Sequence, residues 1–444
     1  MLFRLLLTLL LVALLHAPAR AQRLGDGEVA FEKKAALTNS LRKQLFRGEI
    51  RADPRDKNHV EAVEVAAKET IYPLFWRTER RPEPGAINAL VERFDTALTG
   101  LSGPRGRGNT AETQQLFCQL AIQAVVEVMH HEAAKPIATV NAARILSLIP
   151  ERRAPRDVLH TEKEWADEVL PRLAGGTGEQ LAAACVQLVE DPKTNDGARY
   201  YLLRTLASLL GVPSQVPVVK PETAEKAYAA AVKLVEKKNP FPKATPRQEV
   251  DGYRVLRQQA VKLLAQARVP VVGKDKVALT LARVAGNDEG LAPPPRIEER
   301  IEAAIGLARM APAAAKFPDF QIDYAASQVA RAVAAFGRHA NANLDSKPQM
   351  RLAPWAVEAA RLLEAVEGLR HDVKSPYVQK ATDQCLKLVL ASIERRTPAE
   401  HAALTDWLGL NPPPATSLFK GDEGSAIKPA AEEAIKEEKE EKEK

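Results

Sequence analysis

Residues 188–211 read LVEDPKTNDGARYYLLRTLASLLG. The apolar pair Leu188 and Val189 closes one helical segment, and Asp191 with Pro192 begins a short polar turn. A second helix follows, and its leucines share one face: Leu202, Leu206, Leu209 and Leu210. Two helices joined by so short a turn lie against each other and bury their apolar faces together. The stretch therefore predicts an antiparallel helix pair.

This stretch resembles a HEAT-type repeat, in which an aspartate-containing turn joins two helices and an arginine, here Arg199, opens the second. Residues 298–312 and 276–286 look like second helices of the same kind. The resemblance implies an α-solenoid with a concave surface for a partner, and it implies no catalytic residues. We expect Arg199 to pair with Asp191, Asp196 or the preceding repeat, since a cation near the positive end of a helix needs an acceptor.

Helical periodicity extends over most of the chain, and no convincing alternating run of valine, isoleucine and threonine predicts a sheet. Three stripes illustrate it: positions 116, 117, 120, 121, 124 and 128; positions 322, 325, 329, 333 and 336; and positions 355, 359, 362, 366 and 369. Interleaved charges such as Glu298-Glu299-Arg300 are typical of a solvated helix face. The sequence predicts an all-α fold of antiparallel helix-pair repeats, stacked as an α-solenoid or as an irregular helical array.

Proline-rich joints divide the predicted helices at 212–221, 239–246 and 292–295. The first joint separates an N-terminal helical region, 22–211, from a C-terminal helical-repeat region, 222–427. Residues 428–444 contain one large apolar residue and many Glu and Lys residues, which predicts a charged, disordered tail.

The N-terminus predicts export. A basic start, an apolar run from Leu5 to Leu15 and the small residues Ala19 and Ala21 form a secretory signal peptide over 1–21, so the mature chain begins at Gln22. The apolar run is too short for a permanent transmembrane anchor. We expect a periplasmic or extracellular protein.

The composition limits the kinds of protein and of partner that the sequence is compatible with. Apolar residues make up 45% of the 444, which is enough for a core, and the formal net charge is only +6. Basic clusters lie at 77–81, 105–107, 152–156 and 254–276, without the interleaved aromatic residues of a single-strand stacking surface, so nucleic acid is not expected as a partner. The three cysteines, Cys118, Cys185 and Cys385, are too few and too far apart for a disulfide framework, and we expect buried thiols.

One group of residues has metal-ligand spacing. Glu127, His130 and His131 lie three and four residues apart, which places the carboxylate beside both imidazoles on a helix. Glu-x-x-His is half of a di-iron carboxylate pattern, but its second half is missing. The alternative is that the histidines lie in the last turn of a helix, at the negative end of its dipole. We favour this alternative, so no catalytic, metal or cofactor residue is predicted.

Other motifs add no chemistry. The glycine-rich stretch 103–108, GPRGRG, lacks the Lys-Ser/Thr of a phosphate-binding loop, and no nucleophile elbow or zinc-protease motif occurs. The leading hypothesis is an exported, non-catalytic helical-repeat scaffold that binds another macromolecule, a protein or another macromolecule of the cell envelope. The alternatives are an envelope-associated binder of an anionic polymer and a metal-dependent enzyme that uses Glu127, His130 and His131.

Overall fold

The computed structural model describes residues 24–76, 84–100, 110–132, 134–151, 169–212, 217–237, 241, 245–346, 353–394 and 401–430. The predicted signal peptide, 1–21, lies outside them. Within these residues the regular structure is helical, and the few β-bridges are isolated. The all-α fold class is therefore confirmed.

The helices follow one another closely along the chain. Their bounds are α2 (Leu24–Phe46), α3 (Lys57–Trp76), α4 (Pro84–Gly100), α5 (Ala111–His130), α6 (Pro136–Leu148), α8 (Thr177–Glu190), α9 (Asp196–Leu210), α10 (Pro221–Val235), α11 (Arg247–Leu264), α12 (Val277–Ala285), α13 (Ile297–Ala308), α14 (Ile322–Ser346), α15 (Ala353–Asp372), α16 (Pro376–Glu394) and α17 (His401–Leu410), with 3-10 turns η1 (Ala311–Lys316) and η2 (Glu423–Ser425).

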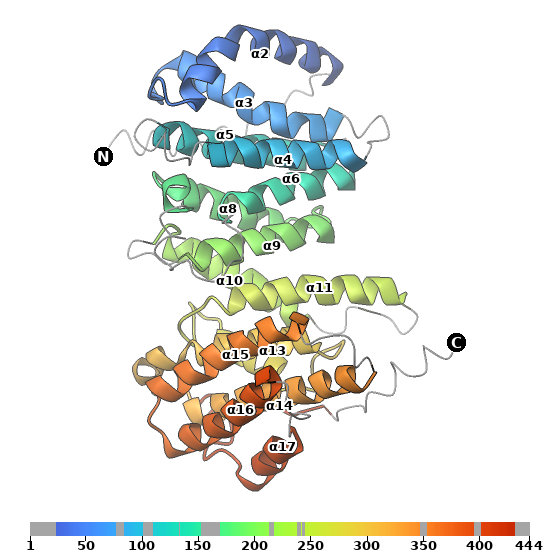
Figure 1. Ribbon diagram of the computed structural model, residues 1–444, viewed down its shortest axis with the longest axis vertical. Coiled ribbons are helices and arrows are strands. Elements are labelled where there is room, and N and C mark those ends of the chain that lie inside the picture. The colour runs from blue at the N-terminus through green and yellow to red at the C-terminus, as the bar shows by residue number, and fades with distance from the viewer. Residues whose placement is uncertain are drawn as a thin grey trace.

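Successive helices form pairs, and the pairs stack along the long axis of the molecule (Figure 1). The first helices of the pairs, α3, α5, α8, α10, α12, α14 and α16, pack on one another in one layer. The second helices, α4, α6, α9, α11, α13 and α15, form the other layer. Helix α2 covers α3 at the N-terminal end. Each helix buries its apolar stripe against its partner and its layer neighbours, which makes an elongated array.

The predicted stripes lie in this interior. Buried positions are Leu116, Phe117, Ala121, Ala124 and Val128 on α5; Ala325, Val329, Val333 and Phe336 on α14; and Ala359, Leu362, Val366 and Leu369 on α15. Each stripe recurs at helical spacing because one face of its helix touches neighbours in both layers.

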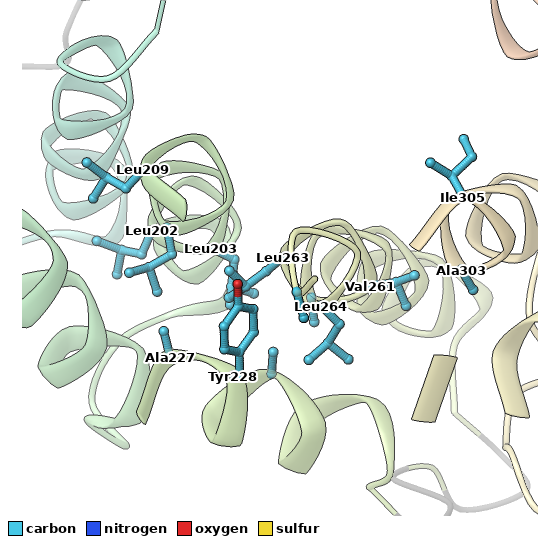
Figure 2. Close-up of a cluster of buried hydrophobic side chains, with 14 of the residues drawn as sticks. Leu202, Leu203, Leu209, Ala227, Tyr228, Val261, Leu263, Leu264, Ala303 and Ile305 are labelled. Atoms are coloured by element: carbon cyan, nitrogen blue, oxygen red, sulfur yellow. The ribbon is translucent and has the colours of Figure 1, made fainter. Parts of the chain in front are cut away.

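The core continues across the predicted boundary at 212–221. Figure 2 shows side chains of α9, α10 and α11 meeting on either side of this joint, among them Leu203, Tyr228 and Leu263. Helix α8 also packs on α10, and α9 packs on α11. The regions 22–211 and 222–427 therefore share one core.

Helices α8 and α9 form the pair that the opening stretch predicts. Arg199 donates from Nε to the carbonyl of Val189 at 3.2 Å and from Nη2 to the carbonyl of Asp191 at 2.9 Å. Its Nη1 bonds the Asp196 carboxylate at 3.0 Å. The expected pairing of Arg199 with Asp196 is confirmed. Two of its three hydrogen bonds, however, go to backbone carbonyls at the end of the preceding helix, α8. Asn195 caps α9, since its side chain accepts from the backbone N–H of Ala198 at 2.9 Å.

We expect Arg199→Ala to lower the free energy of unfolding by about 1–1.5 kcal/mol, because it leaves two carbonyls at the end of α8 without their charged donor. Urea unfolding would measure the loss. Partner affinity of the folded variant is expected to stay unchanged. Normal stability with lost binding would place Arg199 on a recognition surface instead.

The two weaker repeat matches lie in different layers. Residues 298–312 contain α13, a second helix as expected, but 276–286 contain α12, which is the first helix of the same pair. The prediction that 276–286 is a second helix was wrong. The apolar pattern of α12 indicates that the helix is buried, but it does not indicate in which layer.

Helix α13 is enclosed by four helices, α11, α12, α14 and α15. Glu299, Arg300 and Glu302 are buried there, so the predicted solvated face at 298–300 is wrong. Each charge has partners: Glu299 bonds Arg257, Glu302 bonds Arg361, and Arg300 donates to the carbonyls of Ala285 and Arg331. Buried charges persist only when they are paired in this way.

Candidate functional site

Glu127 lies near the end of α5, where it faces α3. Its carboxylate accepts a hydrogen bond from the Tyr72 hydroxyl, and the Lys68 ammonium lies 3.8 Å from Oε2. Lys68 also bonds Glu64 at 2.8 Å, and Glu64 lies 3.6 Å from Lys34 of α2. The carboxylate is therefore one member of a row of alternating charges that crosses α2, α3 and α5.

Three groups of this charge row, Tyr72, Lys68 and Glu64, have pKa values shifted away from neutral pH. Burial, with the neighbouring Glu127 carboxylate, raises the pKa of Tyr72 to about 12. Burial favours the neutral form of Lys68, but the bond to Glu64 and the contacts with Tyr72 and Glu127 together outweigh burial and raise the Lys68 pKa. Burial likewise opposes ionisation of Glu64, yet Lys68 and Lys34 lower its pKa. Lys68 therefore stays protonated and Glu64 stays ionised near neutral pH, as expected for a structural ion pair.

Of the two histidines of the candidate metal site, His130 lies near a different side chain. His130 Nε2 lies 4.0 Å from Asp191 Oδ2, across the turn that follows α8. His131 is the C-cap residue after α5, and its backbone N–H bonds the carbonyl of Val128. In the part of the chain that the structure describes, no three His, Cys, Asp or Glu side chains gather in metal-binding geometry. The structure does not bring Glu127, His130 and His131 together around one point.

We expect the double change His130→Ala with His131→Ala to cost at most about 1 kcal/mol of unfolding free energy, through lost charge at a helix end and some packing. Chemical denaturation would measure this cost. Elemental analysis of native protein provides the control. Stoichiometric iron or zinc that disappears in the double variant would contradict the expectation and restore the enzyme hypothesis.

The three thiols are buried, as expected. Burial raises the pKa of Cys118 and of Cys385 to about 12, and it raises that of Cys185 as well. A thiol that stays protonated is a poor nucleophile and a poor metal ligand. These residues therefore act as small apolar side chains.

Among the basic clusters, 254–276 lies in the described residues, whereas 77–81, 105–107 and 152–156 lie outside them, as does the glycine-rich stretch 103–108. Most cations of 254–276 already have carboxylate partners. The closest N–O distances are 3.6 Å for Arg254–Asp251, 2.5 Å for Arg257–Glu299, 3.6 Å for Lys262–Glu302 and 2.7 Å for Lys276–Asp422. Little positive charge is left there for an anionic polymer.

The second-helix layer carries half-exposed aromatic and arginine side chains on α9. Tyr200 and Tyr201 meet edge to face with ring centroids 5.1 Å apart. Arg204 binds Glu151 with both Nε and Nη2, at 2.5 and 2.9 Å. On the neighbouring α6, Arg144 donates to Asn88 of α4 at 3.1 Å. Tyrosine and arginine are the residue types that most often anchor protein interfaces.

A feature that the sequence did not predict is the segment Leu418–Ala430, which we call the strap. Its first half folds back on itself around Gly421 and η2, and the Leu418 N–H bonds the Ser425 carbonyl at 3.2 Å. It returns along the first layer after α17 and runs beside the loops that flank α12 and α14. Main-chain bonds hold it: Gln321 N–H to the Leu418 carbonyl at 2.8 Å, Lys420 N–H to Asp319 at 2.8 Å, Glu289 N–H to Lys428 at 2.8 Å and Ala430 N–H to Asn287 at 2.7 Å.

Side chains complete the attachment of the strap. Leu418, Phe419 and Ile427 are buried, and the Phe419 ring lies beside Phe320. Asp422 bonds Lys276 at 2.7 Å, and the Ile427 N–H donates to the Tyr324 hydroxyl at 2.7 Å. The predicted tail, 428–444, thus begins too early, because Lys428–Ala430 belong to the strap. The rest of the tail, 431–444, lies outside the described residues.

None of the described helices is both long and apolar enough to cross a bilayer. No protein-family model and no curated protein matches the sequence. Among solved structures, a crystal structure of an engineered protein aligns at 15% identity over 86% of this chain and 95% of its own, with a TM-score of 0.29. A likeness at that score supports no conclusion about fold or function.

Proposed function

We propose that this protein is an exported, non-catalytic helical-repeat scaffold of the HEAT type that binds another protein of the cell envelope. The observation that carries the proposal is the elongated two-layer array of helices (Figure 1). Its second layer presents the half-exposed side chains of Tyr200, Tyr201 and Arg204. A stack in which each pair packs mainly on its neighbours offers long outer faces, and such faces suit partner binding.

The chemistry of the described residues favours binding over catalysis. Ion pairs and a tyrosine hydrogen bond hold the charge row around Glu127, and the buried thiols stay protonated. The alternative of an anionic-polymer binder draws less support, because the cations of 254–276 are largely paired with carboxylates. Export rests on the N-terminal sequence, and N-terminal sequencing of native protein should find Gln22 first.

Affinity capture from an envelope extract tests the binding proposal. The mature chain is the bait, and the paired variant Arg144→Ala with Arg204→Ala removes two cations from the second layer. The matched control is Lys226→Ala with Lys233→Ala, which removes two exposed cations from α10 in the first layer.

We expect the second-layer variant to retain its helical circular dichroism and to recover at least tenfold less partner, while the control recovers the normal amount. If both variants recovered the same amount of partner, the second layer would be excluded as the binding face. Capture that collapses steeply with salt, and that yields polymer in place of protein, would favour the anionic-polymer alternative.

A further inference from the structure

Two arginines from neighbouring helices share one carboxylate where α11 and α13 begin. Arg254 Nη1 lies 3.6 Å from Asp251 Oδ1, and Arg296 donates from Nη2 to the same oxygen. Arg247 Nε lies 3.8 Å from the other oxygen, Oδ2. A single carboxylate cannot neutralise both Arg254 and Arg296.

The ion pair next to this group is already balanced. Arg257 is fully buried, and its Nε and Nη2 lie 2.5 and 3.1 Å from the Glu299 carboxylate oxygens. The whole cluster contains three cations and two anions: Arg254, Arg257 and Arg296 with Asp251 and Glu299. One positive charge is therefore left without a counter-charge among these groups.

Arg254 is the cation that the cluster compensates least. Its side chain is 26% exposed, and its Nε is shielded from solvent without a hydrogen-bond partner among the described residues. Burial lowers the pKa of Arg254, and the positive charge of Arg296 lowers it further. An anion that accepts hydrogen bonds from this guanidinium would remove part of the cost of burying it.

Both helices add positive potential at this place. Helices α11 and α13 run parallel, because Arg296 meets Asp251 near their starts, and near their ends a Cβ atom on Gly306 would lie 2.8 Å from Ala265 Cα. The positive ends of both helix dipoles therefore lie at the cluster. Arg296, which precedes the first residue of α13, is unfavourable at such an end, whereas a bound anion is stabilised there.

We propose that Arg254 and Arg296, at the starts of α11 and α13, form a binding site for one phosphate group. Phosphate oxygens point in several directions and can accept from guanidinium groups on two different helices, whereas one guanidinium fork satisfies a planar carboxylate. Asp251 occupies both arginines when no ligand is bound. The site goes beyond the proposed scaffold function and does not depend on it.

Equilibrium dialysis of the purified protein with radiolabelled inorganic phosphate, at constant ionic strength in chloride, provides the test. Arg254→Gln and Arg296→Gln each remove one cation of the site. Arg268→Gln is the matched control, since it removes an exposed arginine beyond the other end of α11. Asp251→Asn removes the internal competitor. Circular dichroism checks that each variant keeps its helices.

We expect saturable binding of phosphate, about tenfold weaker in Arg254→Gln and in Arg296→Gln because each loses hydrogen bonds to a charged group, and unchanged in Arg268→Gln. Asp251→Asn should bind phosphate about threefold more tightly, because a competing partly exposed ion pair is gone.

Competition distinguishes the two sources of such a group. Displacement of the label by glycerol phosphate, but not by vesicles containing phosphatidylglycerol, assigns the site to a free phosphate ester. Displacement by these vesicles, but not by vesicles of phosphatidylcholine alone, assigns it to a lipid headgroup.

Four results would overturn the proposal. They are no binding at excess phosphate, an equal loss in the Arg268→Gln control, weaker binding by folded Asp251→Asn, and competition by acetate as strong as that by unlabelled phosphate. The last result would make the site a general carboxylate-binding surface.

Discussion

Replacing Glu299 with alanine is expected to lower the free energy of unfolding by about 3–5 kcal/mol, the largest effect that we foresee for a single side chain. Its partner Arg257 is fully buried, and the Glu299 side chain is 2% exposed. Arg257 Nε and Nη2 lie 2.5 and 3.1 Å from the two carboxylate oxygens, and Nη1 donates to the Pro293 carbonyl at 2.7 Å. Without the carboxylate, a guanidinium would remain charged inside the protein.

Urea unfolding followed by circular dichroism measures this loss. The matched control is the double variant Arg257→Met with Glu299→Leu, which replaces both charges with apolar groups and should recover most of the stability. If the single variant lost less than about 1 kcal/mol, water would have to reach Arg257, and the pair would not be the closed contact described above.

The second large effect concerns the same change, glycine to alanine, at two helical positions. Gly306 lies in α13, where a Cβ atom would stand 2.8 Å from Ala265 Cα and 2.9 Å from Leu281 Cδ1. Because a backbone atom blocks the space, α11 and α13 must move apart, and we expect Gly306→Ala to cost about 2 kcal/mol.

Gly252 lies in α11 and has no atom within 4 Å of the corresponding Cβ position. Gly252→Ala should therefore stabilise the protein by about 0.5–1 kcal/mol, since alanine loses less backbone freedom in a helix. Thermal melting of the two variants compares them directly. A stabilising change at both positions would mean that α11 and α13 are packed less closely than the structure indicates.

The positions of the joints illustrate where local sequence is informative. The predicted stop at 211–213 is correct, because α9 ends at Leu210, but Gly211 has a φ of −87° and does not adopt the left-handed conformation that a glycine stop usually signals. A Cβ atom there would lie 2.9 Å from Gln266 Oε1, at the end of a flexible side chain, and 3.1 Å from the Ala207 carbonyl oxygen. The local sequence thus predicts where the helix ends but not the backbone conformation of the glycine that follows it.

By itself, the sequence determined the all-α class, the helix pair around Arg199 and the apolar stripes, because helical periodicity and turn chemistry act between residues a few positions apart. Tertiary structure alone decided the layer of α12, the burial of Glu299 and the path of the strap. Each depends on residues far away in the chain, such as Arg257 for Glu299 and Lys276 for Asp422. The sequence around a charged residue is the same whether its side chain is hydrated or is buried against a distant partner. Only the folded chain distinguishes an exposed charge from a buried one.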